Sequence, residues 1–373
     1  MKGGIWFLAL LLLSTPACRR GSPTRQSTTV AGRFQAIGPM VAARMSPRVA
    51  PLAEGRWLIT SGTYAAQAPD TDTSGCTELF DPATGAFYEL PAMATPRISH
   101  ALAPLPGGDV LVVGGWSKGQ ALDSLERFRG DEGIFEPLAY KLARPRTQAQ
   151  AVALPGGRVA VLGGQGVDGQ PVAEVEVVDP AAGKVWVAAR LAQPRGPGFQ
   201  ATVLEDGSVL VSGGDGKEGP LAALERVDVS RGKVTPLAPM GSARSGHAAL
   251  ALGDGRVLLV GGEGWDSGRR QRIPLDRVEV FEVRLGSCRE LPRLPEARVQ
   301  PAIAQLSDGR ILVAGGWNGS GLLDSSRWWV PETGGWRSGP GLGQPRADDV
   351  LIALWDGRAL LLGSGTDGAE RLE

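Results

Sequence analysis

The segment VLVVGG at residues 110–115 decides the fold, because it recurs along the chain at an almost constant spacing. The clear copies are VAVLGG at 159–164, VLVSGG at 209–214, VLLVGG at 257–262 and ILVAGG at 311–316, and weaker copies are WLITSG at 57–62 and ALLLGS at 359–364. Successive copies end 48 to 54 residues apart. Short apolar runs closed by glycine are typical of buried strands, and a fixed period of this size indicates a repeat protein.

A further glycine lies seven residues before the end of every copy. These glycines are Gly55, Gly108, Gly157, Gly207, Gly255, Gly309 and Gly357. An acidic residue precedes five of them and another glycine precedes the other two, and such dipeptides favour the positive φ of two-residue type I′ hairpin turns. Each repeat is therefore predicted to contain a strand, a tight turn, and the apolar strand that ends at the double glycine.

Two charged residues also recur in register. An arginine precedes each endpoint by 18 or 19 residues, as Arg44, Arg97, Arg146, Arg195, Arg244, Arg298 and Arg346. A glutamate follows the double glycine in six repeats, as Glu78, Glu126, Glu176, Glu225, Glu279 and Glu370, whereas Ser325 and Ser326 replace it in the sixth repeat. The arginines could line the channel mouth and hold an anion, or each could pair with a glutamate of its own or the next repeat. We favour the structural interpretation, because repeated charges usually serve repeated structure.

The third repeat illustrates the predicted unit. Its pattern predicts strands at 150–154, 159–162, 173–178 and 185–188. Four antiparallel strands in about 50 residues are typical of a propeller blade.

Several short motifs within residues 31–373 resemble the kelch-repeat family, whose propeller also occurs in galactose oxidase. The motifs are the double glycine, Asp-Pro after the third strand (Asp81 and Asp179), an aromatic residue in the fourth strand, and then Pro-Arg. Arg97-x-x-His100 and Arg244-x-x-His247 resemble the next signature of that family. The resemblance implies an all-β, seven-bladed kelch-type propeller with four antiparallel strands per blade.

The two ends of the repeat region predict how the ring closes. The last repeat stops within its third strand, near residues 368–372, and it lacks a fourth strand. Residues 33–37 align with the fourth-strand position of other repeats. The N-terminal strand should therefore join three C-terminal strands in the last blade, which removes an exposed sheet edge.

The first 30 residues are predicted to be a targeting segment followed by a flexible tether. Residues 5–13 are an apolar run that fits a secretory signal and is too short to span a bilayer. The residues before Cys18 resemble the lipobox of bacterial lipoproteins, although Thr-Pro-Ala at 15–17 departs from the usual Leu-small-small. We expect residues 1–18 to be a signal peptide with lipid attachment at Cys18, and residues 19–30 to be a flexible tether.

Composition narrows the classes of partner and compartment. The chain has 39 basic and 39 acidic residues among 373, so it lacks the basic excess of a nucleic-acid-binding protein. We expect a monomer that is exported and lipid-anchored to the bacterial envelope, with the outer membrane favoured over a secreted or periplasmic location. Its expected partner is a protein or carbohydrate of the envelope, and its only expected membrane contact is the lipid anchor.

Candidate ligand-binding residues gather at the rim where the second strands end. Trp116 and Trp317 directly follow double glycines, and Asp215 and Glu263 occupy the same repeat position. The longest predicted loops, 63–75 and 263–275, lie at this rim, and the second contains Trp265, Arg269 and Arg270. Indole rings with charged groups suit a sugar or peptide ligand, whereas ordinary loop packing is the alternative interpretation.

Few residues suit catalysis or metal binding. The chain has two histidines, and His100 and His247 fall in blades two and five, too far apart for one copper site of the galactose oxidase type. Cys76 and Cys288 also fall in separate blades, so we expect two small buried residues without a disulfide. The sequence predicts no catalytic residue, cofactor or metal and favours a binding scaffold. A sugar epimerase or mutarotase that uses an acid–base pair on the same rim remains the alternative.

Overall fold

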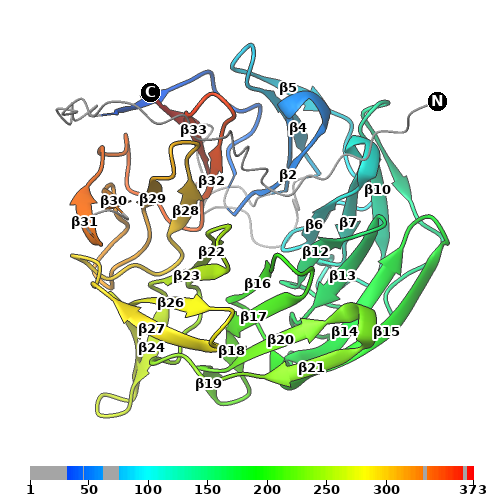
Figure 1. Ribbon diagram of the computed structural model, residues 1–373. Coiled ribbons are helices and arrows are strands. Elements are labelled where there is room, and N and C mark those ends of the chain that lie inside the picture. The colour runs from blue at the N-terminus through cyan, green and yellow to red at the C-terminus, as the bar shows by residue number, and fades with distance from the viewer. Residues whose placement is uncertain (1–31, 45, 62–74, 331–333, 364–367) are drawn as a thin grey trace, which may run out of the picture.

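The computed structural model describes residues 32–373 except 45, 62–74, 331–333 and 364–367. Seven four-stranded antiparallel sheets form a closed ring, as Figure 1 shows, and each sheet is one blade of a β-propeller. The predicted fold class is therefore confirmed. Among the described residues, no helix is long and apolar enough to cross a lipid bilayer.

Within blades one to six the strands run from the channel outward in chain order, and in blade seven the N-terminal strand is outermost. Blade one contains β2 (Arg48–Pro51), β3 (Trp57–Thr60), β4 (Thr77–Asp81) and β5 (Ala86–Leu90). Blade two contains β6 (Ala101–Pro104), β7 (Val110–Val113), β10 (Leu125–Arg129) and β11 (Ile134–Pro137). Blade three contains β12 (Gln150–Leu154), β13 (Arg158–Leu162), β14 (Val172–Asp179) and β15 (Lys184–Arg195). The apolar copies that define the period are thus second strands.

The remaining blades repeat this plan. Blade four contains β16 (Phe199–Val203), β17 (Val209–Gly213), β20 (Leu224–Asp228) and β21 (Lys233–Pro236). Blade five contains β22 (Ala248–Ala251), β23 (Arg256–Val260), β26 (Val278–Glu282) and β27 (Ser287–Leu291). Blade six contains β28 (Ala302–Gln305), β29 (Ile311–Ala314), β30 (Ser326–Val330) and β31 (Gly335–Ser338). Blade seven contains β32 (Val350–Ala353), β33 (Ala359–Leu362), β34 (Glu370–Leu372) and β1 (Phe34–Ala36).

Small additional elements lie between these strands. In the described loops between second and third strands there are three short hairpins: β8 (Trp116–Ser117) with β9 (Gln120–Ala121), β18 (Asp215–Gly216) with β19 (Gly219–Pro220), and β24 (Glu263–Asp266) with β25 (Gln271–Pro274). Short 3₁₀ turns occur at η1 (Ala53–Gly55), η2 (Pro106–Gly108) and η3 (Val229–Arg231).

The ring closes as the sequence predicts. Strand β1 pairs antiparallel with β34, with Phe34 opposite Leu372 and Ala36 opposite Glu370. The N-terminal strand therefore supplies the outermost strand of blade seven. This pairing covers the edge of β34, which would otherwise carry unpaired backbone groups.

The turns between first and second strands differ from the predicted two-residue type I′ form. In blade four the Leu204 N–H donates to the Ser208 carbonyl at 2.8 Å, so three residues form the connection. The Gly207 N–H donates to the Leu204 carbonyl at 2.9 Å, and Gly207 has a φ of 79°. A turn closed by a left-handed glycine explains why the glycine recurs, because other residues adopt that conformation at a cost.

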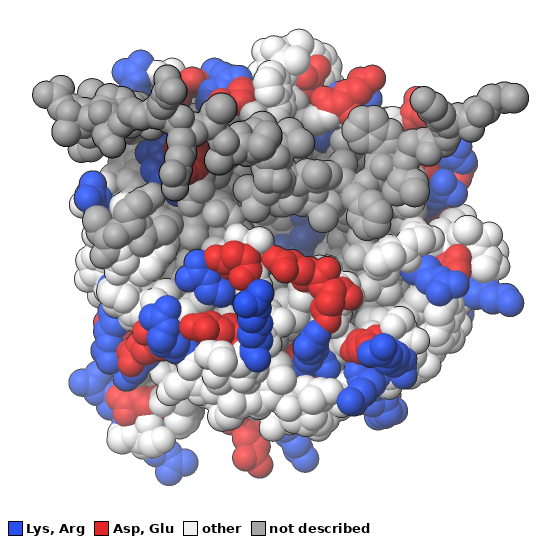
Figure 2. Space-filling view, viewed as in Figure 1, with Lys and Arg blue, Asp and Glu red and all other residues white. Residues whose placement is uncertain are grey.

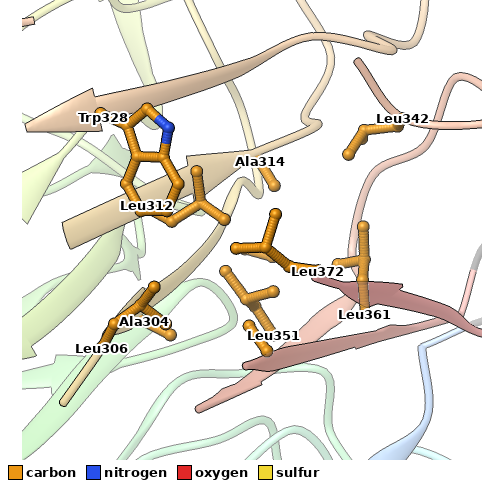
Figure 3. Packing of buried hydrophobic residues seen from close by; sticks show 11 residues of the cluster. Ala304, Leu306, Leu312, Ala314, Trp328, Leu342, Leu351, Leu361 and Leu372 are labelled. Carbon is orange, nitrogen blue, oxygen red and sulfur yellow. The ribbon is translucent and has the colours of Figure 1, made fainter. Parts of the chain in front are cut away.

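The apolar core lies between neighbouring blades. Figure 3 shows the cluster between blades six and seven, where Leu312 and Trp328 face Leu351, Leu361 and Leu372. The second strands are buried on both faces, which explains their continuous apolar runs without polar alternation. Packing of this kind fixes the blades relative to one another and gives the loops of one rim a rigid base.

Candidate functional site: the mouth of the central channel

The seven repeat arginines lie inside the blades, and each is at most 1% exposed. In blade two the Nη1 group of Arg97 donates to the Gly114 carbonyl at 2.9 Å and to the Ser124 carbonyl at 3.0 Å. Gly114 follows the second strand and Ser124 precedes the third, so the arginine ties together the two ends of the loop above it. Arg44, Arg146, Arg195, Arg244 and Arg298 make the same pair of bonds in their blades.

Six of the arginines also bond the glutamate of their own blade. Arg97 Nη2 lies 2.6 Å from Glu126 Oε1, and the corresponding pairs are Arg44 with Glu78, Arg146 with Glu176, Arg195 with Glu225, Arg244 with Glu279, and Arg346 with Glu370. The carboxylate also accepts bonds from the connector between blades, such as those from the Ala94 and Thr95 N–H groups at 2.9 and 3.0 Å. Burial lowers the pKa of Arg97, and the neighbouring Glu126 opposes that shift. These six arginines therefore form buried ion pairs within their blades.

Blade six obtains its carboxylate from a different element. The register places Arg327, not Ser325 or Ser326, opposite Val313, at the position of the glutamate in other blades. Glu296, two residues before Arg298, supplies the carboxylate instead and pairs with Arg298. The same oxygen, Glu296 Oε1, lies 2.9 Å from Arg327 Nη2 and accepts a hydrogen bond from Ser325 Oγ at 2.6 Å. Burial lowers the pKa of Arg298 to about 10, while Glu296 opposes the shift.

A ring of left-handed residues surrounds the mouth of the channel. They follow the repeat arginines by two residues, or by three in blade four: Ser46, Ser99, Gln148, Gly198, Gly246, Gln300 and Asp348. Their φ values lie between 51° and 75°. Backbone bonds join neighbours, with the Gly246 N–H donating to the Gly198 carbonyl and the Gln300 N–H donating to the Gly246 carbonyl, each at 2.8 Å. The repeated bonds offset the backbone strain of the non-glycine members.

A cavity of about 520 Å³ opens inside this ring, between the loops of blades four to seven and Ser46. Trp317 and Leu322 form apolar parts of its wall and remain 40% and 51% exposed. The carboxylates of Asp215, Glu263 and Asp348 are polar parts of the wall. Figure 2 shows acidic and basic side chains side by side along one edge of the central hollow.

Two of these carboxylates share one arginine. Arg272 of β25 bonds Glu263 Oε1, and its Nη2 lies 2.9 Å from Asp215 Oδ1 in the neighbouring blade. Burial lowers the pKa of Arg272, but the hydrogen bonds to Glu263 and Asp215 outweigh it and raise the pKa above its usual value. The third carboxylate, Asp348, accepts a hydrogen bond from the Ser46 hydroxyl.

The structure separates the residues that the sequence grouped at the rim. Trp317, Asp215 and Glu263 meet at the cavity, whereas Trp116 lies half-buried in blade two. Trp265 is 51% exposed on the β24–β25 hairpin, which projects away from the centre of the ring in Figure 1.

The basic candidates near the hairpin tip also lie outside the cavity. Arg269 and Arg270 fall between β24 and β25, and the Arg269 side chain is 74% exposed. The described residues that line the cavity therefore do not include Trp116, Trp265, Arg269 or Arg270. The predicted loop at 63–75 and the lipid-attachment candidate Cys18 fall outside the described residues, apart from Gly75.

The two histidines are buried between blades and do not meet. His100 Nε2 lies 2.8 Å from Thr60 Oγ1, and His247 Nε2 lies 2.8 Å from Ser212 Oγ. Burial, reinforced by Arg244 and Arg195, lowers the pKa of His247 to about 3, and burial also lowers that of His100. Within the described part of the chain, no three acidic, histidine or cysteine side chains are grouped to hold a metal.

The cysteines correct one prediction. Cys76 is exposed rather than buried, and it lies just before β4, where its carbonyl accepts a hydrogen bond from Arg44. Cys288 lies half-buried in β27, where burial and then Glu279 raise the pKa of its thiol to about 12. Both are free thiols.

Comparison with known proteins supports the fold. No family model matches the chain, and no curated protein matches it in sequence. Among solved structures, the chain is similar to a novel fungal alcohol oxidase with catalytic diversity among the AA5 family, determined in complex with copper. The two chains share 17% identity and a TM-score of 0.74, over 92% of this chain and 76% of the oxidase. At this level of identity, the similarity supports the β-propeller fold alone.

Sequence reasoning missed the residues that shape the mouth. The left-handed ring leaves a weak signal, a Ser, Gln, Gly or Asp at a nearly fixed distance after each arginine. Asp348 belongs to this ring and shares its weak signal, whereas Leu322 gave no signal, because it matches no repeat motif.

Proposed function

We propose that the protein is a binding scaffold whose ligand occupies the mouth of the central channel. The cavity of about 520 Å³ carries this proposal, because apolar and acceptor groups from several blades converge there. Concave sites with apolar walls and a few placed polar groups are typical of ligand binding. Trp317 supplies an aromatic surface, and Asp215, Glu263 and Asp348 supply acceptors.

The enzymatic alternative receives less support. An epimerase or mutarotase needs an acid and a base that are free to exchange protons with the substrate. Asp215 and Glu263 are both engaged by Arg272, and Asp348 accepts a bond from Ser46. The similar solved structure described above is an oxidase rather than an epimerase.

A binding screen tests the proposed scaffold. The full chain would be titrated with glycans, peptidoglycan fragments and short peptides, and binding would be followed by calorimetry. Trp317→Ala should abolish binding of any hit, because it removes the aromatic wall, while Trp355→Ala should leave it unchanged. Trp355 is a matched control, since it is 75% exposed beside the β32–β33 turn at the opposite rim. Binding that survives Trp317→Ala would place the site elsewhere.

We also propose that the scaffold is displayed from a bacterial envelope, with its partner a protein or carbohydrate of that envelope. The lipobox-like residues before Cys18 support this proposal. Metabolic labelling with an alkyne fatty acid should modify the wild-type chain and fail with Cys18→Ser. Equal labelling of both chains would contradict the anchor, and fractionation would test the expected outer-membrane location.

A further inference from the structure

We propose that the group held at the channel mouth is an organic cation, an alkylammonium or guanidinium of the kind that a lysine or arginine side chain of a peptide carries. This inference rests on the proposed binding function and specifies its ligand chemistry. It follows from the charge of the cavity wall, the aromatic surface beside it, and the absence of a metal-like arrangement among the described residues.

The charge of the wall is one-sided. Asp215, Glu263 and Asp348 line the cavity, and no described lysine, arginine or histidine does. Arg272 contacts two of the carboxylates without lining the cavity, which leaves an excess of two negative charges. A cleft with charges of one sign concentrates the field of those charges and attracts ligands of the opposite sign.

Of the three cavity carboxylates, Asp348 is the one that forms no ion pair with a described residue. The Ser46 hydroxyl donates to Asp348 Oδ2, and the Asp348 N–H donates to the Gln300 carbonyl at 3.1 Å. These bonds fix the side chain and the backbone at the wall but supply no positive charge. The nearby Arg346 pairs with Asp349 and Glu370, and no described lysine or arginine forms an ion pair with Asp348. A cationic ligand would complete the pair with a charge-assisted hydrogen bond.

The ring is open on the side where the other two carboxylates lie. Its members in blades four and five are Gly198 and Gly246, whereas the other five positions carry side chains. A Cβ on Gly198 would lie 2.2 Å from Ser245 Oγ and 2.6 Å from the Gly246 nitrogen. Backbone alone therefore fits there, and the space beside Asp215 and Glu263 stays accessible.

The remaining wall fits an organic cation better than a metal ion. Trp317 can attract a cation to its ring face, and Leu322 can contact the apolar stem of a long basic side chain. A calcium ion instead needs six to eight oxygen ligands close together. No three acidic, histidine or cysteine groups converge in that way in the described ranges.

Calorimetry with defined probes tests the inference on the full chain. The peptide acetyl-Gly-Lys-Gly-amide should bind, and the same peptide with an acetylated lysine side chain should bind at least about tenfold more weakly, because acetylation removes the charge. Butylamine is the second arm: equal affinity would identify a free amine as sufficient, and tighter peptide binding would identify a peptide ligand. Calcium chloride is the third arm, and tight binding of calcium that displaces the peptide would overturn the inference.

Matched variants locate the charge that matters. Asp348→Asn should weaken binding of the lysine peptide about threefold to tenfold, as removal of one partly exposed ion pair does. Glu54→Gln is the control, because Glu54 is an exposed acid, 80% accessible, in the turn at the opposite rim. If Asp348→Asn lowers the melting temperature, Glu263→Gln provides the second test with the same expected loss.

The outcomes separate this inference from the proposed function. Equal binding of the charged and acetylated peptides, or unchanged binding by both acidic variants, would overturn the cationic ligand. A neutral ligand that binds the wild type, and that Trp317→Ala no longer binds, would then still support the scaffold. Failure of every probe and every screened ligand would overturn both.

Discussion

Glu296 should be among the most important single carboxylates for stability, because two arginines depend on it. Arg298 is fully buried and Arg327 is 18% exposed, and both bond Glu296 Oε1. Removing one partner of a buried pair costs about 3–5 kcal/mol, since the other charge stays buried without compensation. Glu296 is itself 27% exposed, so water can enter, and we expect Glu296→Ala to lower the free energy of unfolding by about 3 kcal/mol.

Returning blade six to the arrangement of blade two should restore this loss. Blade two has Thr95 and Glu126 at the corresponding positions, with Glu126 bonding Arg97 at 2.6 Å. The double variant Glu296→Thr with Arg327→Glu should therefore recover to within about 1 kcal/mol of the wild type, a gain that independent sites would not give. Urea denaturation followed by tryptophan fluorescence measures both variants.

A surface variant serves as the control for this cycle. Glu290→Ala removes a carboxylate that is 53% exposed and lies 3.0 Å from Arg277, so it should cost less than about 1 kcal/mol. If the double variant Glu296→Thr with Arg327→Glu were as unstable as Glu296→Ala, a glutamate at position 327 could not replace the carboxylate of Glu296, and the reasoning would be refuted. A Glu296→Ala variant as stable as the control would refute the buried pair.

Three other predictions follow from the described contacts. The free energy of unfolding should fall as the pH drops from about 6.5 towards 3, because His247 takes up a proton in the unfolded chain but stays neutral in the folded protein, where its pKa is lowered to about 3. Between pH 6 and 5 the loss due to His247 is about 1 kcal/mol. Urea denaturation at both pH values should show that His247→Gln lacks this pH-dependent loss. Deletion of residues 32–36 removes β1 and should lower the melting temperature and promote aggregation, so an unchanged melting curve would contradict the closure. A thiol reagent at pH 8 should modify exposed Cys76 quickly and Cys288 only after unfolding, because the pKa of the Cys288 thiol is raised to about 12. Equal modification rates of the two thiols in the native protein would contradict the burial of Cys288.

The blade plan could be predicted because its signal is repeated. One apolar run such as 110–115 fits a buried strand or part of a helix, but seven runs in register with a glycine and an arginine define the unit. The closure by β1 and β34 was also accessible, because residues 33–37 align with fourth strands and the last repeat lacks one. The interior position of arginines such as Arg97 follows the same logic, since a glutamate recurs with them.

Blade six and the turns show what repetition did not reveal. The sixth repeat lacks its glutamate, as the sequence predicted, but the register gives that position to Arg327 rather than to Ser325 or Ser326, and the carboxylate comes from Glu296. Spacing in the sequence does not reveal this exchange, because both residues lie in ordinary charged segments. The turn at Gly207 likewise depends on which backbone groups bond, and the dipeptide before it fits more than one turn type.

The sequence by itself determined the number of blades, the order of their strands and the place where the ring closes. These features depend on local periodicity and on residues that recur every 50 positions or so. Only the tertiary structure decided the mouth, where Asp215, Trp317 and Asp348 come together from three blades while Trp265 points elsewhere. The physical reason is that the repeats specify identical blades, whereas the cavity arises from positions at which the blades differ, and closure of the ring alone makes such positions neighbours.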